Sequence, residues 1–390
     1  MDSPSLAAGH QRSVAGETVH PSPSPPAHCS LAASSLAASS LGQAILAGDS
    51  SRPGSRGAAG RTPPASAVSI PFYAPVANEL AAVERCLQLE LQSPYESLAP
   101  LLRHGVQLGG KRLRPVLVLL AGAAIDPHRV GKHHETLAAV LEMVHTATLI
   151  HDDVLDGASQ RRHVATINAT WGDHASILLG DYLFSQAFRL SASTGSALAC
   201  QWIGEAARRV CEGELRQVMA RDQVDLDQAA YIEMIRGKTA DLCGVACRLG
   251  ASFAAADEHQ VKALFDYGIA LGIAFQIADD YLDLWGDTDS VGKTLGTDLE
   301  QGKWTLPVLR LKQTASGAAA QKLFAALNAH PSARRRLIMP LLSNSDAQEY
   351  TRQIAKDYRD TACQAIRDLP ESRAKCSLID LATFAIERTF

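Results

Sequence analysis

The feature that most constrains the fold is the absence of proline from a long central stretch. No proline occurs from His128 to Leu306. Proline removes a helix hydrogen bond and clashes with the preceding turn, so its absence leaves room for long helices. Ala, Leu, Glu, Gln, Arg and Ile predominate here, and apolar residues recur at intervals of three and four. We therefore predict that the stretch is almost entirely helical.

Residues 70–390 are predicted to form one all-α domain. Asn-Gly turns between alternating β-branched runs, the usual sign of β-hairpins, are missing, so an α/β fold has little support. No linker rich in Pro, Gly and Ser divides these residues, although the stretch is longer than a typical domain. The later prolines Pro307, Pro331, Pro340 and Pro370 are expected at helix starts and in loops.

Residues 1–69 differ in composition from the rest of the chain. They consist mostly of Ser, Ala, Pro and Gly and lack periodic bulky residues, so we expect a disordered extension. No charged segment followed by an apolar one indicates a secretory signal. The expected location is the cytoplasm. An organelle is the alternative, because Ser and Ala richness with few acidic residues is also typical of transit peptides.

Charge, hydropathy and cysteine spacing exclude further classes. The 37 basic and 41 acidic side chains give a net charge of −4, without the basic excess typical of nucleic-acid binders. The longest clear apolar run, Pro115 to Ile125, is shorter than the roughly 18 residues of a membrane span, so no transmembrane segment is expected. The eight cysteines form no Cys-x-x-Cys pair, and we interpret them as reduced core thiols.

The most informative motif is Asp-Asp-x-x-Asp, which occurs at 152–156 and again at 279–283. Positions four apart share a helix face, so each motif presents a pair of carboxylates one turn apart. An apolar helix precedes each motif. Neighbouring carboxylates repel one another unless a cation lies between them, and Mg²⁺ held by carboxylates and substrate phosphates is the usual solution. The pattern therefore predicts a phosphorylated ligand.

Basic residues near these motifs are candidates for binding the phosphate. Lys111 and Arg114 lie three apart at a glycine-opened helix start, where backbone N–H groups and the helix dipole also favour anions. The other candidates are Arg161, Arg162, Lys238, Lys293 and Lys303. Arg presents a fork that matches phosphate, whereas Lys presents a compact charge.

Two uncharged polar side chains share a helix face with the aspartates. His145 lies on one stripe with the first motif, so its ring would project on the carboxylate face and could donate a hydrogen bond to a phosphate. Gln276 precedes the second motif by three residues. Gly268 and Gly272 lie on roughly the same side, and they either permit close helix packing or leave room for a ligand.

These residues resemble the motifs of the trans-isoprenyl diphosphate synthases, the polyprenyl synthetase family, and in particular the long-chain octaprenyl and solanesyl type. The resemblance extends from about residue 70 to the C-terminus. The segments that carry it are Gly-Gly-Lys-Arg-Leu-Arg-Pro (109–115), 145–156, Arg161-Arg162, Gly180-Asp181, Glu212-Gly-Glu214, Gly237-Lys-Thr239, 275–283 and the stretch from Gly292-Lys293 to Pro307. His163 stands where the family usually has Gly.

The resemblance implies a single bundle of antiparallel helices around a central hydrophobic cavity, with both aspartate motifs at its mouth, and a homodimer. The implied activity is a Mg²⁺-dependent condensation of isopentenyl diphosphate with an allylic prenyl diphosphate by successive head-to-tail trans elongation. The expected product is a long-chain polyprenyl diphosphate for quinone side chains. A shorter-chain farnesyl or geranylgeranyl diphosphate synthase and a non-catalytic subunit of a heteromeric synthase are the alternatives.

The resemblance also implies roles for individual residues. The expected metal ligands, for about three Mg²⁺ ions in each site, are Asp152, Asp156 and Asp279. The carboxylates that would orient ligands or metal-bound water are Asp153, Asp280 and Asp283; with Lys238, all six aspartates count as catalytic. The expected allylic-substrate contacts are Arg161, Lys238, Thr239, Gln276 and Lys293. The expected contacts to isopentenyl diphosphate are Lys111, Arg114, His145 and Arg162. Lys303 would close the site.

Product length is expected to depend on the residues just before the first motif. Ala147 and Thr148 lie five and four positions before Asp152 and are both small. In the family, bulky aromatic side chains there stop elongation early, whereas small ones let the chain pass deeper. The resemblance therefore implies a long product.

Overall fold

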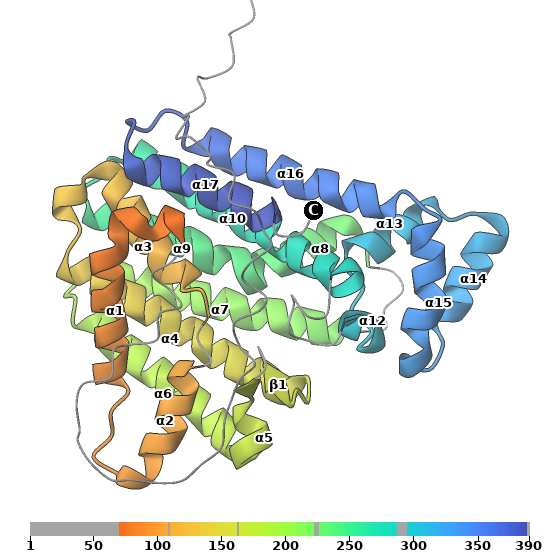
Figure 1. Ribbon diagram of the computed structural model, residues 1–390, viewed down its shortest axis with the longest axis horizontal. Coiled ribbons are helices and arrows are strands. Elements are labelled where there is room, and N and C mark those ends of the chain that lie inside the picture. Colours follow the sequence, from red (N-terminus) through yellow and green to blue (C-terminus); the bar gives the residue numbers. More distant parts are fainter. Residues whose placement is uncertain (1–69, 108–109, 162–163, 222–225, 287–294, 388–390) are drawn as a thin grey trace, which may run out of the picture. The chain divides into compact units, whose positions relative to one another are not determined.

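Helices contain nearly all of the described residues, as the proline-free stretch predicts (Figure 1). The computed structural model describes residues 70–107, 110–161, 164–221, 226–286 and 295–387, which all lie in one compact unit. Within these ranges the only strands are β1 (Gln160–Arg161) and β2 (Val164–Ala165), a short antiparallel pair. The all-α prediction is confirmed. The predicted extension, 1–69, lies outside the described residues.

The helices are, in chain order, η1 (Pro71–Val76), α1 (Ala77–Glu90), η2 (Glu96–Leu98), α2 (Ala99–Gln107), α3 (Leu113–Ile125), η3 (Pro127–Arg129), α4 (Lys132–Leu155), α5 (Ile167–Trp171), α6 (Asp173–Ala192), α7 (Ala197–Met219), α8 (Gln228–Ile235), η4 (Arg236–Ala240), α9 (Asp241–Phe253), α10 (Glu258–Trp285), α12 (Thr297–Glu300), α13 (Leu306–Thr314), α14 (Gly317–Leu327), α15 (Pro331–Ser343), α16 (Ala347–Ala365) and α17 (Arg373–Glu387).

Local sequence explains where the central helix α10 begins. Asp257 lies just before it, and the Asp257 side chain accepts a hydrogen bond of 2.8 Å from the backbone N–H of Gln260. The Gln260 side chain in turn accepts from the Asp257 N–H at 3.1 Å. This reciprocal pair satisfies two backbone donors that the first turn leaves open. The capped helix then runs without interruption to Trp285, so the second aspartate motif lies in its last turns.

Helices α4 and α10 position the two motifs. α4 packs against α3 and α6, and α10 packs against α9 and α16. A Cβ on Gly268 would lie 2.5 Å from the Cys243 carbonyl oxygen, and one on Gly272 would lie 2.5 Å from the Ala240 Cα. These two glycines therefore permit close helix packing, which was one of the two interpretations of their spacing.

The apolar character of α10 reflects its burial inside the protein. By length and composition it is the one described helix that could cross a membrane, with a mean window hydropathy of 1.4, although no uninterrupted apolar run marks it in the sequence. However, 56% of that window is buried against other helices. Packing against α9 and α16 therefore accounts for its apolar side chains.

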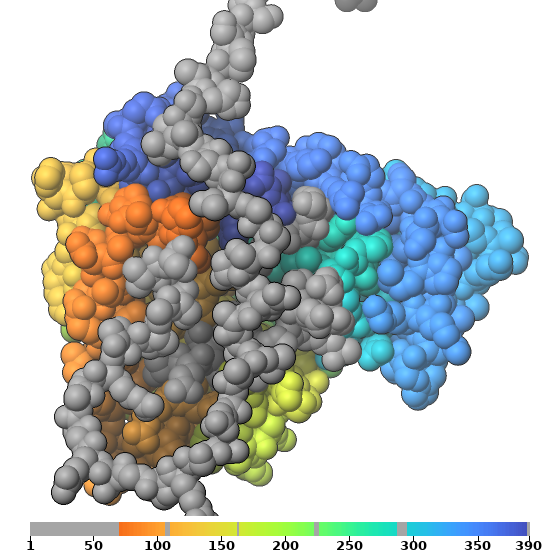
Figure 2. All heavy atoms as spheres, viewed as in Figure 1, coloured from red at the N-terminus to blue at the C-terminus, as the bar shows by residue number. Residues whose placement is uncertain are grey.

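Helices α13, α14 and α15 extend the unit away from the N-terminal helices, whereas α17 packs against α3 and η1. α14 and α15 lie at the end remote from α1 (Figure 1), and in Figure 2 the blue surface of the C-terminal helices forms that end and also borders the orange N-terminal helices. Pro307 and Pro331 lie in the first turns of α13 and α15, and Pro370 lies in a loop, as expected. Pro340 does not, because it lies inside α15. It falls in the last turns, where its missing N–H removes one hydrogen bond of the helix.

The described cysteines are free thiols, but not all belong to the core. Cys86, Cys243 and Cys247 are buried, and their pKa values are raised because burial disfavours the thiolate. Cys211 is exposed on α7, so the interpretation of the cysteines as core thiols is wrong at that position. Its helix presents one face to solvent, and the sequence pattern alone does not show which.

Candidate active site

Two of the first-motif carboxylates face different cations. Asp153 is buried, and the guanidinium of Arg161 donates to its Oδ1 from Nε at 3.0 Å and from Nη2 at 2.8 Å. Burial raises the Asp153 pKa, and Arg161 partly offsets that rise. Asp156 at the end of α4 accepts from Lys303 Nζ at 3.0 Å and from Arg221 Nη2 at 3.0 Å. The structure therefore brings two of the candidate basic residues, Arg161 and Lys303, to the first motif.

Asp152, the third first-motif carboxylate, lies near Lys238 and Glu214. Burial raises the pKa of Asp152 to about 6; the Lys238 ammonium opposes this rise, and the Glu214 carboxylate adds to it. Lys238 forms an ion pair with Glu214 and donates a hydrogen bond of 3.0 Å to Gln217 Oε1. Burial lowers the Lys238 pKa, but the neighbouring Asp152 and Glu214 carboxylates outweigh it and the net shift is upward. Negative charge is thus concentrated around Asp152.

A π-helical turn, η4, carries Lys238 and Thr239 to this position. π-Helical segments are rare and occur often at functional sites. A Cβ on Gly213 would lie 2.6 Å from the Lys238 backbone nitrogen, so α7 and η4 touch through their backbones. This contact places Glu214 beside Lys238. The sequence pattern shows neither the π turn nor the backbone contact.

The second motif is tied into a chain of hydrogen bonds. Thr239 Oγ1 donates to Gln276 Oε1 at 2.8 Å, and Gln276 Nε2 donates to Asp280 Oδ1 at 2.8 Å. The Tyr231 hydroxyl donates to Asp280 Oδ2 at 2.6 Å. Burial, with the nearby Asp298 carboxylate, raises the Asp280 pKa to about 7 although both hydrogen bonds oppose it. The predicted contacts Thr239 and Gln276 therefore lie together, next to the motif.

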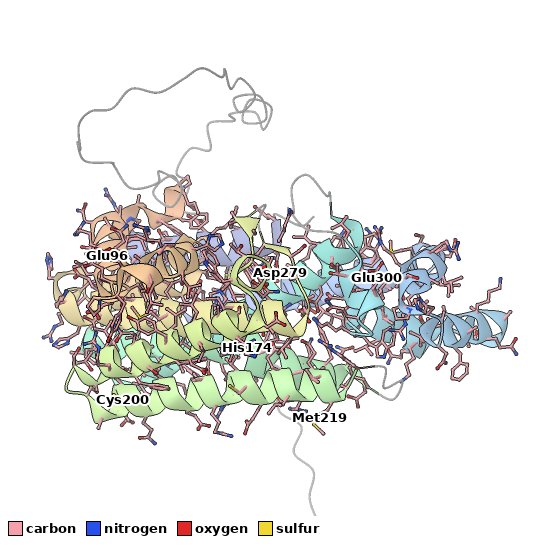
Figure 3. The ribbon with its side chains drawn as sticks, turned by 90° about the horizontal axis from the view of Figure 1, so that it is seen from below. Glu96, His174, Cys200, Met219, Asp279 and Glu300 are labelled. Carbon is pink, nitrogen blue, oxygen red and sulfur yellow. The ribbon has the colours of Figure 1, made fainter. Side chains whose placement is uncertain are left out.

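Asp283 accepts hydrogen bonds from a different part of the chain than Asp280 does. It is 1% exposed, accepts from Thr297 Oγ1 at 3.0 Å, and also accepts from the Asp298 backbone N–H at 3.3 Å. These bonds hold the start of α12, which lies beside the end of α10 that carries Asp279 (Figure 3). The Lys303 backbone N–H donates to the Asp298 carbonyl at 2.8 Å. Through α12, the second motif is thus linked to the lysine that binds Asp156.

The remaining predicted phosphate contacts lie near the start of α3. Lys111 is exposed, and its Nζ is 5.2 Å from the centre of the Phe384 ring. Arg114 is only 8% exposed, and its Nε is buried without a hydrogen-bond partner among the described residues. A buried guanidinium with an unsatisfied donor suits an anionic ligand. His145 is half-buried on α4, which packs against α3.

Two predicted residues, Arg162 and Lys293, lie outside the described residues. The chain-length candidates are described: Ala147 is fully buried, and Thr148 is half-buried with its hydroxyl donating to the His145 carbonyl at 2.8 Å.

Arg221, which binds Asp156, was missed by the sequence analysis. It is a single arginine at the end of α7, 65 positions from its partner, and no motif signals it.

Within the described ranges, no group of three or more His, Cys, Asp or Glu side chains lies close enough together to hold a metal ion. Asp152, Asp156 and Asp279 therefore do not form one cluster among the described residues, and their assignment as metal ligands stays a prediction. Their chemistry fits Mg²⁺, which prefers carboxylate oxygens.

Comparison with known proteins identifies the family. The polyprenyl synthetase family model matches residues 95–339. Octaprenyl diphosphate synthase of Escherichia coli (strain K12) is 36% identical over 315 residues, which cover 80% of this chain and 96% of that protein. Heptaprenyl diphosphate synthase component 2 of Geobacillus stearothermophilus is 37% identical over 322 residues, which cover 82% and 98%.

A solved structure that is similar to this chain indicates the same family as the two relatives. The crystal structure of polyprenyl synthase from Caulobacter crescentus CB15, complexed with calcium and isoprenyl diphosphate, matches with a TM-score of 0.77 and 36% identity. The match covers 84% of this chain and 100% of that one. Because the family model spans more than half of the chain and the relatives match over nearly their whole length, this chain belongs to the polyprenyl synthetase family.

Proposed function

We propose that the protein is a Mg²⁺-dependent prenyltransferase that condenses isopentenyl diphosphate with an allylic diphosphate, repeatedly and head to tail, to a long-chain polyprenyl diphosphate. The observation that carries the proposal is the meeting of the first-motif carboxylates with Lys238, Arg161 and Lys303 at the end of a buried apolar helix. That arrangement binds a diphosphate at the mouth of a hydrophobic region. The octaprenyl name of the Escherichia coli relative supports a long product.

The proposed roles follow from position and charge. Asp152, Asp156 and Asp279 would hold Mg²⁺, which when bound supplies positive charge to the departing diphosphate. Lys238, Thr239 and Gln276 would contact the allylic substrate, and this is supported by the hydrogen bond that joins Thr239 to Gln276. Lys111, Arg114 and His145 would hold the second diphosphate. Asp280 would hold the Gln276 side chain, and Asp283 would hold the start of α12, through the hydrogen bonds described above.

The chemistry requires no protein nucleophile. The allylic C–O bond breaks, and its electron pair leaves with the diphosphate, whose charge Lys238 and Arg161 stabilise. The double bond of isopentenyl diphosphate then attacks the allylic carbon, which forms the new C–C bond. A proton is lost, to the released diphosphate in our proposal, and a new double bond results. Exclusion of water from the site protects the cationic carbon.

Product sizing tests this function. The purified chain is incubated with Mg²⁺, labelled isopentenyl diphosphate and allylic primers of increasing length, and the extracted products are sized. We expect products longer than each primer by several isoprene units. Products extended to farnesyl or geranylgeranyl length only would favour the shorter-chain alternative. If no primer is extended in the presence of Mg²⁺, the proposal is wrong for the isolated chain.

We also propose a homodimer formed through α6 and α7. Both helices expose large apolar side chains, and α7 runs along the face drawn in Figure 3, from near Cys200 to Met219. The exposed apolar residues on these helices are Ile177, Leu178, Phe188, Leu198, Leu215, Val218 and Met219. A surface of this kind is typical of protein interfaces. A heteromer is the second candidate, because one relative is named as component 2 of its synthase.

The proposed location is the cytoplasm. The organelle alternative depends on residues 1–69, which lie outside the described residues. We propose quinone side chains as the use of the product.

A further inference from the structure

Arg112 differs from the two basic residues that flank it in the Lys111 to Arg114 segment. Its backbone has φ 55° and ψ 36°, the left-handed region, and Ala255 is the only other described non-glycine residue with a positive φ. The side chain is 7% exposed. Left-handed backbone is unfavourable for a residue with a Cβ, so something must hold Arg112 in this conformation.

Two carboxylates from different helices hold it. Arg112 Nε donates to Glu84 Oε1 at 2.5 Å and Nη2 donates to Glu84 Oε2 at 3.1 Å, a two-bond fork to α1. Arg112 Nη1 donates to Glu142 Oε1 at 2.8 Å, on α4. Glu142 lies one turn before His145 on the same helix. The guanidinium therefore connects the start of α3 to α1 and to the helix that carries His145.

The neighbouring backbone is anchored as well. The Tyr73 hydroxyl donates to the Lys111 carbonyl oxygen at 2.9 Å. Together with the Arg112 fork, this bond fixes the chain between Lys111 and Arg114. Beside this anchored backbone the Lys111 side chain is exposed, while the Arg114 side chain is buried and its Nε has no described hydrogen-bond partner.

The buried ion cluster of Arg112, Glu84 and Glu142 is poorly suited to a role in stability alone. Glu142 is 2% exposed, and its Oε2 is buried with no hydrogen-bond partner in the part of the chain that the structure describes. A buried ion cluster is often no more stabilising than well-packed apolar side chains of similar volume. A left-handed non-glycine residue and an unsatisfied buried oxygen are additional costs. Unfavourable conformations of this kind concentrate at functional sites.

We propose that Arg112 is a positioning residue for the diphosphate of isopentenyl diphosphate. It acts through Lys111, Arg114 and His145, whose spacing it sets by joining α1, α3 and α4. The inference rests on the proposed function, because it assigns isopentenyl diphosphate to these residues. It predicts that loss of the fork weakens binding of isopentenyl diphosphate and leaves binding of the allylic substrate unchanged.

The test compares Arg112→Lys, which keeps the charge but loses the fork, with Lys375→Met. Lys375 on α17 is a matched control, since it is also a buried basic residue, 4% exposed. Its Nζ donates to the Arg367 and Leu369 carbonyls at 2.7 and 2.8 Å. For Arg112→Lys we expect KM and the calorimetric Kd for isopentenyl diphosphate to rise about tenfold, with KM for the allylic primer changed by less than about twofold. For Lys375→Met we expect a lower Tm and unchanged KM values.

Equal rises of both KM values, or an unchanged KM and Kd for isopentenyl diphosphate in a folded Arg112→Lys protein, would overturn the proposal. If that variant fails to fold, Glu84→Gln takes its place, because it preserves the shape of the fork partner; the same selective rise is expected there, and its absence overturns the proposal. Failure of the proposed function has a different signature. The wild-type chain would then extend no primer, while calorimetry still reports whether isopentenyl diphosphate binds and whether Arg112→Lys weakens it.

Discussion

At the scale of single residues, the site is defined by cations that face buried carboxylates. Lys238 is the clearest example, because it lies between Glu214, Gln217 and the Asp152 carboxylate. In the proposed reaction its ammonium stabilises charge on the leaving diphosphate. We expect Lys238→Met to lower kcat by about 100-fold, since one preorganised charge is removed from the transition state.

Steady-state kinetics with saturating substrates measures this effect. Lys262→Met is the control, because Lys262 forms an exposed ion pair with Asp266 on the surface of α10. Its kcat should equal that of the wild type. A Lys238→Met enzyme with full kcat would exclude the lysine from the chemical step.

Arg161 and Asp153 give a prediction for stability. We expect Arg161→Met to lower the free energy of unfolding by about 1–3 kcal/mol at neutral pH, because the Asp153 carboxylate is then buried without its main partner. Burial already raises the Asp153 pKa, and removal of Arg161 should raise it further. The folded state then binds the proton more tightly than the unfolded state, so stability falls as pH rises through the folded-state pKa.

Urea unfolding at a series of pH values measures this prediction. The deficit of Arg161→Met relative to the wild type should shrink as the pH falls below neutral, because Asp153, whose pKa is raised in the folded state, becomes protonated. Asp153→Asn combined with Arg161→Met should show a smaller deficit than the single arginine variant near pH 8. A deficit that grows toward low pH would contradict this account of the pair.

At the scale of helices, the contact between α7 and η4 sets the position of Lys238. Gly213→Ala would place a Cβ 2.6 Å from the Lys238 backbone nitrogen, and backbone cannot move as easily as a flexible side chain. We expect a loss of about 1–3 kcal/mol in stability. Because η4 must shift, kcat should also fall, by about tenfold or more.

Gly204 on the same helix is a matched control for that substitution. A Cβ there would meet no atom within 4 Å. Gly204→Ala should therefore raise the free energy of unfolding by about 0.5–1 kcal/mol through helix propensity alone, and leave kcat unchanged. If the two alanine variants behave alike in thermal unfolding and in kinetics, the backbone contact has no functional role.

Helix α4 also carries the position expected to limit product length. Ala147 is fully buried and lies five positions before Asp152. We expect Ala147→Phe to shorten the products, because the larger ring would block the path of the growing chain. Chromatographic sizing of the extracted products measures it, with Thr148→Ala as a control that adds no bulk. Products of unchanged length from a folded Ala147→Phe enzyme would refute Ala147 as the stop position.

At the scale of the whole molecule, the exposed apolar residues of α6 and α7 underlie the proposed homodimer. Leu215 is 61% exposed. We expect Leu215→Glu to shift the protein from dimer to monomer in analytical ultracentrifugation, because a charge cannot be buried in an apolar interface without a partner. Phe324→Glu on α14 is the control, since Phe324 is similarly exposed at 63% and α14 lies at the end of the unit remote from α6 (Figure 1). A wild-type monomer, or a dimer that both variants retain, would contradict the proposed interface.

Much of this protein follows from local sequence patterns. The period of three to four, the missing prolines and the repeated aspartate motif predict helices that end in carboxylates, and α4 and α10 have that form. These patterns are readable because helical geometry relates residues only a few positions apart. Family membership is likewise visible in the ordered motifs from Lys111 to Lys303.

Tertiary structure alone decided which charges meet. The sequence predicts the carboxylate of Asp156 but not that Arg221 and Lys303 bind it, from positions 65 and 147 residues away. It predicts Asp283 in the motif but not that this side chain holds the start of α12. Likewise, the sequence does not predict the backbone contact between α7 and η4 or the fork of Arg112 to Glu84. Such pairings depend on how whole helices pack, and one sequence carries no local signal of the distance between residues that are remote along the chain.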